Sequence, residues 1–261
     1  MPEGHTLHRL ARQQRRQFAG LPIEVSSPQG RFEAQLVDGR VLDGVSAHGK
    51  HLFAAFGDRI VHVHLGLYGK FTSGTELPPA PRGALRMRWT APSGWTDLRG
   101  PTACEVLAPS EVEAVIARLG PDPLRRGADG TRAYERIRRS RAPVAGLVMD
   151  QQVLAGVGNV YRAELLFRHR LDPYLPGREL DAVIWAAMWN DLIALMRAGV
   201  RSGRIVTTHA ADRARATGRV SRDDAHYVYR RHGQPCRVDG TSIRMEVLGG
   251  RKLYWCPTCQ A

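Results

Sequence analysis

The sequence Met1-Pro2-Glu3-Gly4-His5 opens the chain and leads directly into a helical stretch, residues 5–18. Apolar residues recur at helical spacing through this stretch, and Gly20 follows it as a stop signal. We therefore expect a helix that holds Pro2 and Glu3 at its N-terminus. The dipole of that helix would favour a bound anion such as a phosphate, and it would oppose protonation of a nearby amine.

The residue types at this start predict covalent chemistry. Removal of Met1 would leave Pro2 with a free secondary amine. An α-amino group titrates at about 7.7 to 8, whereas lysine titrates at about 10.4, so more of the N-terminal amine is unprotonated at neutral pH. Glu3 is one residue away and can supply a proton to a leaving oxygen. The alternative is an ordinary frayed chain start, and the rest of the sequence has to decide between the two.

Composition and charge indicate a nucleic-acid partner. The 261 residues are 43% hydrophobic, enough for one large or two ordinary domains, and the net charge is +13. Residues 201–261 contain 12 Arg and Lys against 5 Asp and Glu. This excess favours a polyanion such as DNA over a merely solvated basic face. The sequence shows neither an apolar run of membrane-spanning length nor a signal peptide, so we expect a soluble intracellular protein that does not act at a membrane.

The first half of the chain is typical of antiparallel β-structure, because most of its strand-like runs have no helix between them. The alternating run 31–37 ends in Asp38-Gly39, a hairpin signal. Further strands are expected at 41–45, 51–56, 60–65, 85–89 and 95–98. Together they predict a sandwich or barrel.

The second half is predicted to be helical. Ser110 to Glu113 is typical of a capping box whose helix ends at Gly120-Pro121. Residues 120–131 are typical of an interdomain linker, and 202–224 of an irregular, mobile loop. Helices are expected at 145–154, 159–169 and 179–198.

Two turns in this sequence are candidates for phosphate contacts. Lys50 lies where one strand turns into the next, and Asn159 follows a Gly156-Val157-Gly158 turn, where it can cap a helix while its amide reaches a phosphate. Leu67 and Tyr68 lie in a glycine-flanked loop from which they can wedge into a base stack, although such residues are more often core. His62 and His64 share a strand face, and we assign them a structural role.

The cysteines of the C-terminal region indicate a metal site. Cys256 and Cys259 form a C-P-x-C knuckle, and Cys236 is followed three positions later by Asp239, where a four-cysteine zinc ribbon would have its fourth ligand. We expect one structural zinc ion held by Cys236, Asp239, Cys256 and Cys259. His232 is an alternative fourth ligand, and an absent metal is a further alternative. Between the two cysteine groups, Gly249-Gly250-Arg251 is typical of a hairpin turn that presents Arg251 to a phosphate.

Taken together, these motifs resemble the bacterial formamidopyrimidine-DNA glycosylase and endonuclease VIII family from end to end. The resemblance rests on Met1 to His5, on Met149-Asp150-Gln151 with residues 156–161, and on Arg251 with residues 256–260. The family implies an α+β fold: an N-terminal helix with an antiparallel β-sandwich, then a helix-two-turn-helix domain with a C-terminal zinc β-hairpin. The corresponding boundaries here are 1–119, a linker at 120–131, 132–225 and 226–261.

The resemblance also implies an activity and a role for each candidate residue. Pro2 would attack C1′ of a damaged nucleotide flipped out of the DNA duplex, Glu3 would act as general acid toward the sugar ring oxygen, and Lys50, Asn159 and Arg251 would clamp phosphates. This describes a bifunctional DNA glycosylase and AP lyase that cleaves the strand by β,δ-elimination. Lys50 and Arg251 are included in the catalytic set. By the same resemblance the enzyme is a monomer in the bacterial cytoplasm, on the nucleoid when bound to DNA.

The subfamily is indicated by two short stretches. Gly4-His5 and Leu67-Tyr68 are more similar to endonuclease VIII, which prefers oxidised pyrimidines, than to the branch that removes 8-oxoguanine. The Arg and aromatic pair of that other branch is missing after Asp97, where the chain continues through Gly100-Pro101. Leu67 and Tyr68 would then fill the void left by the flipped base. Two other functions remain open: a non-catalytic damaged-DNA-binding protein on the same scaffold, and a zinc-ribbon RNA-binding protein.

Overall fold

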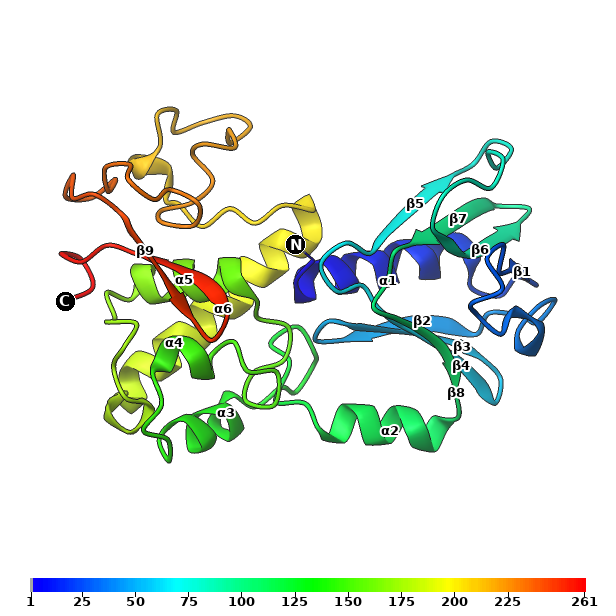
Figure 1. Ribbon diagram of the computed structural model, residues 1–261, viewed down its shortest axis with the longest axis horizontal. Coiled ribbons are helices and arrows are strands. Elements are labelled where there is room, and N and C mark those ends of the chain that lie inside the picture. Colours follow the sequence, from blue (N-terminus) through cyan, green and yellow to red (C-terminus); the bar gives the residue numbers. More distant parts are fainter. Residues whose placement is uncertain (1) are drawn as a thin grey trace. The chain divides into compact units, whose positions relative to one another are not determined.

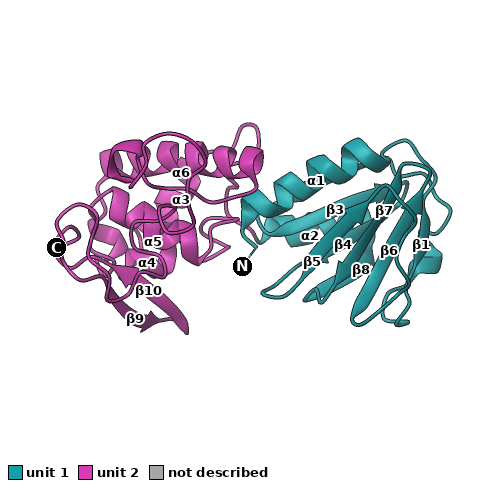
Figure 2. Cartoon of the chain, turned by 90° about the horizontal axis from the view of Figure 1, so that it is seen from above, with its two compact units in different colours: residues 1–118 teal, residues 119–261 magenta. Residues whose placement is uncertain are grey.

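A computed structural model describes residues 2–261 of the protein. The chain divides into two compact units, Met1–Arg118 and Leu119–Ala261 (Figure 2). The α+β fold class expected from the sequence is confirmed, with a β-sandwich in the first unit and a helical domain with a β-hairpin in the second (Figure 1).

Unit 1 contains two four-stranded antiparallel sheets, in the orders β1-β6-β7-β5 and β2-β3-β4-β8. Its helices are α1 (Gly4–Phe18) and α2 (Pro109–Ala117), with a 3-10 turn η1 (Ala34–Leu36). Its strands are β1 (Glu24–Ser26), β2 (Gly44–His48), β3 (His51–Phe56), β4 (Arg59–His64), β5 (Lys70–Gly74), β6 (Leu85–Ala91), β7 (Gly94–Arg99) and β8 (Ala103–Leu107).

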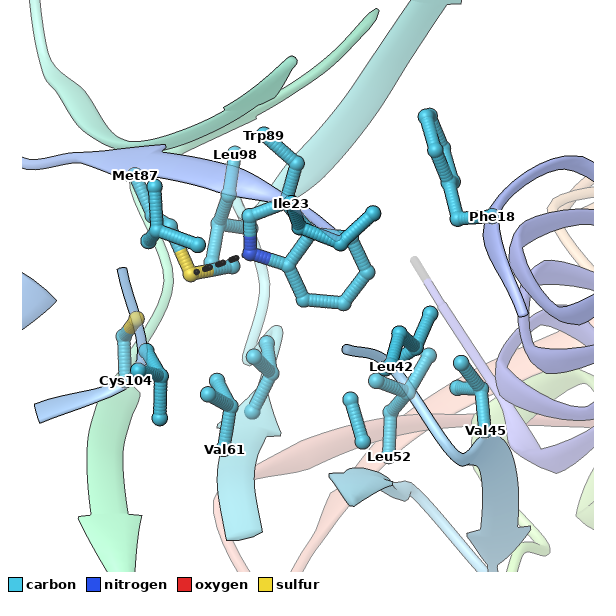
Figure 3. Packing of buried hydrophobic residues seen from close by; sticks show 14 of the residues in the cluster. Phe18, Ile23, Leu42, Val45, Leu52, Val61, Met87, Trp89, Leu98 and Cys104 are labelled. Atoms are coloured by element: carbon cyan, nitrogen blue, oxygen red, sulfur yellow. Dashed lines mark hydrogen bonds between the residues drawn. The ribbon is translucent and has the colours of Figure 1, made fainter. Parts of the chain in front are cut away.

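The core of unit 1 lies between the two sheets and α1 (Figure 3). Trp89 from β6 is fully buried and meets Phe18 of α1 and Phe56 of β3 edge-on, with ring centroids 6.0 and 5.8 Å apart. Its indole N–H donates to the sulfur of Met87 over 3.2 Å, so the buried polar group is satisfied. Helix α1 is therefore fixed by its apolar face to both sheets, and its N-terminal residues have a rigid support.

One expected strand is absent. Residues 31–37 form turns and η1, because their backbone closes local bonds such as Val37 N–H to the Ala34 carbonyl, 3.0 Å. The buried side chains in this stretch are Phe32 and Val37. They are five positions apart, and an odd separation would place them on opposite faces of a strand. The Asp38 side chain accepts a hydrogen bond from the Val25 N–H over 2.7 Å, and this bond attaches the turn to strand β1.

The expected strands at 51–56, 60–65, 85–89 and 95–98 are confirmed within one or two residues, whereas β2 begins three residues later than predicted. The prediction missed β1, β5 and β8. The helix predicted from a capping box at Ser110 begins earlier, at Pro109, with Ala108 as N-cap, and ends at Ala117. The Glu111 side chain reaches back to the N-cap residue, as in a capping box, and accepts a hydrogen bond from the Ala108 N–H over 2.8 Å.

Unit 2 is a helical domain that ends in a two-stranded hairpin. Its helices are α3 (Gly130–Ile137), α4 (Val144–Leu147), α5 (Asn159–Arg168) and α6 (Ala182–Ser202), with 3-10 turns η2 (Gly177–Glu179) and η3 (Ala210–Asp212). Its strands are β9 (Arg244–Leu248) and β10 (Arg251–Trp255). Strand β10 packs on α5, and Leu253 enters the main core of the unit.

Two helices of unit 2 differ from the prediction. The helix expected at 145–154 stops after α4 because Asp150 and Gln151 organise a series of turns in its second half. The helix expected from residue 179 begins at Ala182, since Asp181 caps it by accepting the Val183 N–H over 2.7 Å. It ends at Ser202, and the φ of 73° at the following Gly203 is the left-handed conformation typical of the residue after a helix.

Within residues 2–261, α6 is also the one helix long and apolar enough to cross a membrane by length and composition. Core helices meet the same criterion, and α6 contributes buried side chains to the core of unit 2: Trp185, Met188, Leu192 and Met196. The loop predicted at 202–224 is irregular, as expected. Its two ends are nevertheless joined, because Thr208 donates to the Asp224 carbonyl over 2.6 Å.

Candidate active site and metal centre

The N-terminus of α1 presents Pro2 and Glu3 as the sequence predicts. Glu3 is the residue before the helix, and its carbonyl accepts the Thr6 N–H over 2.8 Å. The Glu3 side chain is fully buried and does not cap the helix. The expected removal of Met1 concerns a residue outside those described. A buried carboxyl group one residue from Pro2 has the position that a proton donor beside a proline amine requires.

His5 is a neighbour of this pair to which sequence reasoning gave no role. It is buried in the first turn of α1, and burial is the main cause that lowers its pKa to about 4. Its ring Nε2 lies 3.3 Å from the Thr6 hydroxyl. At neutral pH the first turn therefore holds an uncharged imidazole, which adds no positive charge near Pro2.

Lys50 lies in the two-residue turn between β2 and β3. His48 and His51 face each other at the base of this hairpin, and Gly49 has a φ of 56°, which glycine adopts without strain. Because the turn is so short, the position of Lys50 is set by the register of the two strands. Its side chain is half-buried.

Leu67 and Tyr68 are exposed, with 45% and 86% of their surface accessible. Their loop is packed against the turn that joins β7 to β8: a Cβ added to Gly66 would lie 1.9 Å from the Thr102 hydroxyl oxygen. The Thr102 N–H also donates to the His64 carbonyl over 2.9 Å, and Gly69 N–H donates to Leu65. An apolar and an aromatic side chain thus project from a braced loop, as a wedge would require.

The turn after Asp97 is too short to form a second wedge. Asp97 is fully buried and pairs with Arg88 over 2.6 and 2.9 Å and with Arg99 over 2.9 Å. Only Gly100, Pro101 and Thr102 separate β7 from β8. The Arg and aromatic pair expected of the other branch therefore has no place in this turn.

Asn159 does not cap α5, contrary to the sequence prediction. Gly158 occupies the N-cap position, and Asn159 is the first helical residue, 7% exposed. Its amide nitrogen donates to the Lys252 carbonyl over 2.8 Å, and its oxygen accepts from Arg162. Arg162 also donates to the same carbonyl over 3.1 Å. The side chain turns away from the helix end because the adjacent hairpin offers it a partner.

Gln151 organises the turn that precedes α5. Its amide nitrogen donates to the carbonyls of Met149 and Val157 over 2.7 and 2.9 Å, and its oxygen accepts the Gly156 N–H over 3.0 Å. One side chain thereby closes the loop 149–157. Gln151 is one of the residues on which the family resemblance rests, but the sequence alone predicted no role for it.

Arg251 begins β10, next to the Gly249-Gly250 turn predicted from the sequence. Both glycines have positive φ angles, 56° and 71°, the conformation of a two-residue hairpin turn that suits twisted strands. Arg251 is exposed and faces Leu248 across the hairpin. The hydrogen bonds from Asn159 and Arg162 to Lys252 fix this end of the hairpin to α5.

Glu164 is a further residue to which the sequence analysis gave no role. Its carboxylate is fully buried and accepts the backbone N–H groups of Tyr227, Val228 and Tyr229 over 2.7 to 2.8 Å, as well as the Thr207 hydroxyl. The arrangement joins α5 to the segment that leads into the cysteine-rich hairpin. A glutamate within an apolar helical run is the signal that would have identified it.

Cys236, Asp239, Cys256 and Cys259 come together, with their ligand atoms within 4.8 Å of one another. His232 is not part of this group. Tetrahedral zinc with Zn–S bonds of about 2.3 Å requires sulfur atoms about 3.8 Å apart, and Cys236 Sγ and Cys259 Sγ are 3.9 Å apart. Asp239 Oδ2 lies 3.1 Å from Cys259 Sγ, while Oδ1 accepts the Thr241 N–H over 2.9 Å. The four residues therefore fit one zinc ion with a single carboxylate oxygen as ligand.

Three family models cover most of the sequence. The formamidopyrimidine-DNA glycosylase N-terminal domain matches residues 1–103, the H2TH domain of the same glycosylase matches 119–210, and the zinc finger found in FPG and IleRS matches 233–261. Endonuclease 8 1 of Mycobacterium tuberculosis (strain ATCC 25618 / H37Rv) is 52% identical over the full length of both chains. The chain belongs to the formamidopyrimidine-DNA glycosylase and endonuclease VIII family.

Other members of this family are more distant. The formamidopyrimidine-DNA glycosylase of Acidothermus cellulolyticus is 33% identical over 88% of this chain and 82% of its own. The MutM (Fpg) protein of Thermus thermophilus has the same fold, with a TM-score of 0.80 at 27% identity over 99% of this chain and 98% of that one. Family membership confirms the predicted enzyme class, DNA glycosylase with AP lyase activity, and the zinc finger confirms a structural zinc.

Proposed function

We propose that this protein is a bifunctional DNA glycosylase and AP lyase that removes oxidised pyrimidines through a Schiff base on Pro2. The observation that supports this most directly is the burial of Glu3 at the N-terminus of α1, one residue from Pro2. A buried carboxyl group can hold a proton for a leaving oxygen, and the helix end disfavours a proton on the adjacent amine.

The glycosylase step forms one bond and breaks another. The Pro2 nitrogen donates its lone pair to C1′, and the bond from C1′ to the base nitrogen breaks with its electron pair remaining on the base. The proton that the Pro2 nitrogen then loses balances the proton that the departing base takes up. The C1′–O4′ bond then opens as the iminium ion forms, and the Glu3 carboxyl group protonates O4′. A secondary amine yields an iminium ion that is permanently cationic, and this cation prepares the sugar for elimination.

The lyase step follows from that cation. Loss of a proton from C2′ gives an enamine that expels the 3′ phosphate, and a second elimination expels the 5′ phosphate. Water then releases the sugar fragment from Pro2. The products are strand ends that both bear phosphate, with the DNA chain interrupted at the damaged nucleotide.

Lys50, Asn159 and Arg251 would position the phosphates around the lesion. Lys50 is held in a tight hairpin turn, and Arg251 begins a strand fixed to α5 through Lys252. One N–H of the Asn159 amide bonds the Lys252 carbonyl, and an amide has a second N–H to offer a phosphate. The zinc ion at Cys236, Asp239, Cys256 and Cys259 takes no part in the reaction; these residues hold the ends of the hairpin together.

Lesion choice follows from the loop that presents Leu67 and Tyr68. Their exposure allows them to fill the stack after a base leaves it, and the short turn after Asp97 provides no competing wedge. The DNA partner is a damaged duplex, bound by a monomer. The basic charge of +13 supports this binding, which would occur on the nucleoid in the bacterial cytoplasm.

The test is borohydride trapping on a duplex that contains one abasic site or one oxidised pyrimidine. We expect a covalent adduct, located by mass spectrometry on the N-terminal peptide, and strand ends bearing phosphate. Pro2→Gly retains a primary amine and tests the need for proline, while the same chain with an uncleaved N-terminal extension blocks the amine. An adduct that persists with the blocked N-terminus would contradict the proposal.

The same assay addresses the non-catalytic alternative. Tight, salt-sensitive binding to damaged duplex without any adduct, in protein shown to lack Met1, would identify a DNA-binding protein that does not turn over. A preference for 8-oxoguanine over oxidised pyrimidines in the cleavage assay would leave the chemistry intact and would overturn the assignment of the lesion.

A further inference from the structure

Helix α1 presents a row of arginines that the chemistry above does not use. Arg12, Arg15 and Arg16 are exposed, and they lie on the face opposite to Leu7 and Phe18, which are fully buried in the core of unit 1. The helix sequence contains no aspartate or glutamate. We call these three arginines the arginine face of α1.

No group within the described part of the chain neutralises this face. Among residues 2–261, none forms an ion pair or a hydrogen bond with the guanidinium group of Arg12, Arg15 or Arg16. Arg168, by contrast, donates two hydrogen bonds to the Asp191 carboxylate over 2.6 and 2.7 Å. The charge of the arginine face is therefore open to solvent and to any anion that binds there.

The spacing of the three arginines works against the helix. Arg12 is three residues from Arg15 and four from Arg16, separations at which side chains on a helix are neighbours and like charges destabilise it. Arg15 and Arg16 lie in the last turn, where the helix dipole favours positive charge, but that effect does not extend to the preceding turn with Arg12. The dipole accounts for two of the arginines, whereas an external anion accounts for all three.

The helix that carries the arginine face is firmly attached to the sheets. The Gln17 amide donates hydrogen bonds to the carbonyls of Gly74 and Ser93 over 3.4 and 3.1 Å. The rings of Phe18 and Trp89 meet edge-on in the core. A surface that is already ordered loses less entropy on binding, so the face is prepared for a partner.

The arginine face lies away from the residues that meet the lesion. The helix begins at Gly4, and at a rise of 1.5 Å per residue Arg12 and Arg16 are about 12 and 18 Å further along its axis. It starts at the end of unit 1 where the Lys50 turn and the loop 66–69 also lie, and it runs away from that end (Figure 1). A lesion held beside Pro2 therefore leaves the arginine face available to other DNA.

We propose that the arginine face of α1 binds the phosphate backbone of a second DNA segment while the lesion site engages the first. Neighbouring arginines on the helix are about 5–6 Å apart at Cβ, and duplex DNA carries one negative charge per about 1.7 Å of its axis. Guanidinium groups also bind phosphate oxygens through two parallel hydrogen bonds. The proposal goes beyond the proposed function, because it requires DNA binding but no reaction at Pro2.

The composition of the face favours DNA over an acidic protein. Protein interfaces have a core of apolar and aromatic side chains, whereas DNA interfaces are polar and strongly basic. Among residues 2–261, none of the large apolar side chains that are exposed lies on α1. Contacts to phosphate carry no sequence information, so the second segment can be any duplex. A protein bound to two segments can pass from one to the other without first dissociating, which would speed its search for lesions.

The test measures how competitor DNA changes the rate of dissociation. The full-length protein is bound to a short fluorescent duplex with a tetrahydrofuran abasic analogue, and an unlabelled, undamaged duplex is added at increasing concentration. We expect the dissociation rate to rise with competitor concentration in the wild type. This dependence should be lost in the triple variant R12Q/R15Q/R16Q, because glutamine keeps the helix propensity and removes the charge.

A charge-matched variant controls for the loss of three positive charges. Arg82, Arg132 and Arg197 are exposed arginines outside α1, and R82Q/R132Q/R197Q should keep the competitor dependence. In the wild type, the competitor-dependent rate constant should fall with salt with a log–log slope of about −2.7, or 0.9 for each of three phosphate contacts. Thermal unfolding of both triple variants checks that the fold is retained.

Three results would overturn the proposal. A dissociation rate that does not depend on competitor in the wild type would show that no second segment binds. If R12Q/R15Q/R16Q instead weakens binding to the labelled duplex and lowers its salt slope by about 2.7, the arginines contact the lesion duplex itself. Polyglutamate that accelerates dissociation as strongly as DNA would assign the face to an acidic protein.

Borohydride trapping separates this proposal from the proposed function. R12Q/R15Q/R16Q should form the Pro2 adduct with an abasic duplex as the wild type does. A wild type without any adduct would refute the proposed function, while the competitor dependence would still decide whether α1 binds a second segment.

Discussion

The side-chain amide of Asn159 donates a hydrogen bond to the backbone carbonyl of Lys252 over 2.8 Å. This bond joins the first residue of α5 to the strand that begins with Arg251. Two residues that the sequence marks separately as phosphate contacts are therefore mechanically linked within unit 2.

Replacement of Asn159 by alanine should therefore affect the hairpin as well as the phosphate. We expect the free energy of unfolding to fall by about 2 kcal/mol, at about 1 kcal/mol for each of the two hydrogen bonds that the side chain makes. Affinity for abasic-site duplex should fall as well. Asn190→Ala, an exposed asparagine on α6, is the matched control. The link is disproved if Asn159→Ala in an Arg251→Ala background weakens binding as strongly as it does alone.

Glu164 should be among the residues most sensitive to a small change. In the wild type the Glu164 carboxylate accepts hydrogen bonds from the backbone N–H groups of residues 227–229. Glu164→Gln would replace one of its acceptor oxygens with an NH2 donor that faces these N–H groups. Because a buried charged acceptor is lost, we expect unfolding stability to fall by about 3 kcal/mol. Urea unfolding measures the change, with exposed Glu113→Gln as control. An equal effect of the two substitutions would mean that the three bonds contribute little.

The carboxylate ligand should make the zinc site weaker than a four-thiolate site. Asp239→Cys should retain zinc longer against EDTA, because thiolate is the softer ligand, and Asp239→Ala should lose it faster. Zinc content after dialysis is the measurement, and Asp223→Ala, an exposed aspartate nearby in sequence, is the control. Unchanged zinc content in Asp239→Ala would remove Asp239 from the ligand set.

The loop of Leu67 and Tyr68 can be disturbed without changing either residue. In Gly66→Ala the new Cβ would meet the Thr102 hydroxyl at 1.9 Å, and the φ of 65° is unfavourable for alanine. We expect this variant to excise oxidised pyrimidines more slowly than the wild type and to cleave abasic sites at the normal rate. Thr102→Ala removes the clashing oxygen and should restore part of the rate in the double variant. Failure of that rescue would place the defect in the backbone conformation.

Stability should depend on pH through buried histidines. Burial lowers the pKa of His5 from 6.5 to about 4 and is the main cause that lowers that of His51 to about 3. The unfolded chain therefore binds protons more readily, so the stabilisation is complete above pH 6.5 and is lost as the pH falls. Below about pH 6.5 the free energy of unfolding should therefore fall with decreasing pH, and each of these histidines should contribute about 1.4 kcal/mol per pH unit to that slope.

Urea unfolding between about pH 6.5 and 5 measures this slope before most carboxylates titrate. His5→Gln should reduce it by about 1.4 kcal/mol per pH unit, the contribution of one proton. A slope that is the same in His5→Gln and in the wild type would show that His5 is not held neutral by the fold.

Much of the local structure follows from sequence because its causes are local. The spacing of apolar residues predicts α1, the glycine pair at 249–250 predicts the hairpin, and the cysteine spacing predicts the metal site together with Asp239. The helix and the turn depend on neighbours within a few residues, through helix periodicity and permitted φ angles. The metal site depends on two short ligand pairs, Cys236 with Asp239 and Cys256 with Cys259. The expected strand at 31–37 failed because a hydrophobic alternation does not reveal which partner strand is available.

Contacts between groups far apart in the chain depend on how whole elements pack. Asn159 with Lys252, Glu164 with the backbone at 227–229, and His62 with Glu105 are pairs more than 40 residues apart in the chain. No local pattern encodes these contacts, since each polar side chain is buried where packing of whole elements puts a complementary atom within reach. Sequence motifs therefore identify the family and predict its chemistry, while the packing of whole elements sets which buried polar groups support the predicted site.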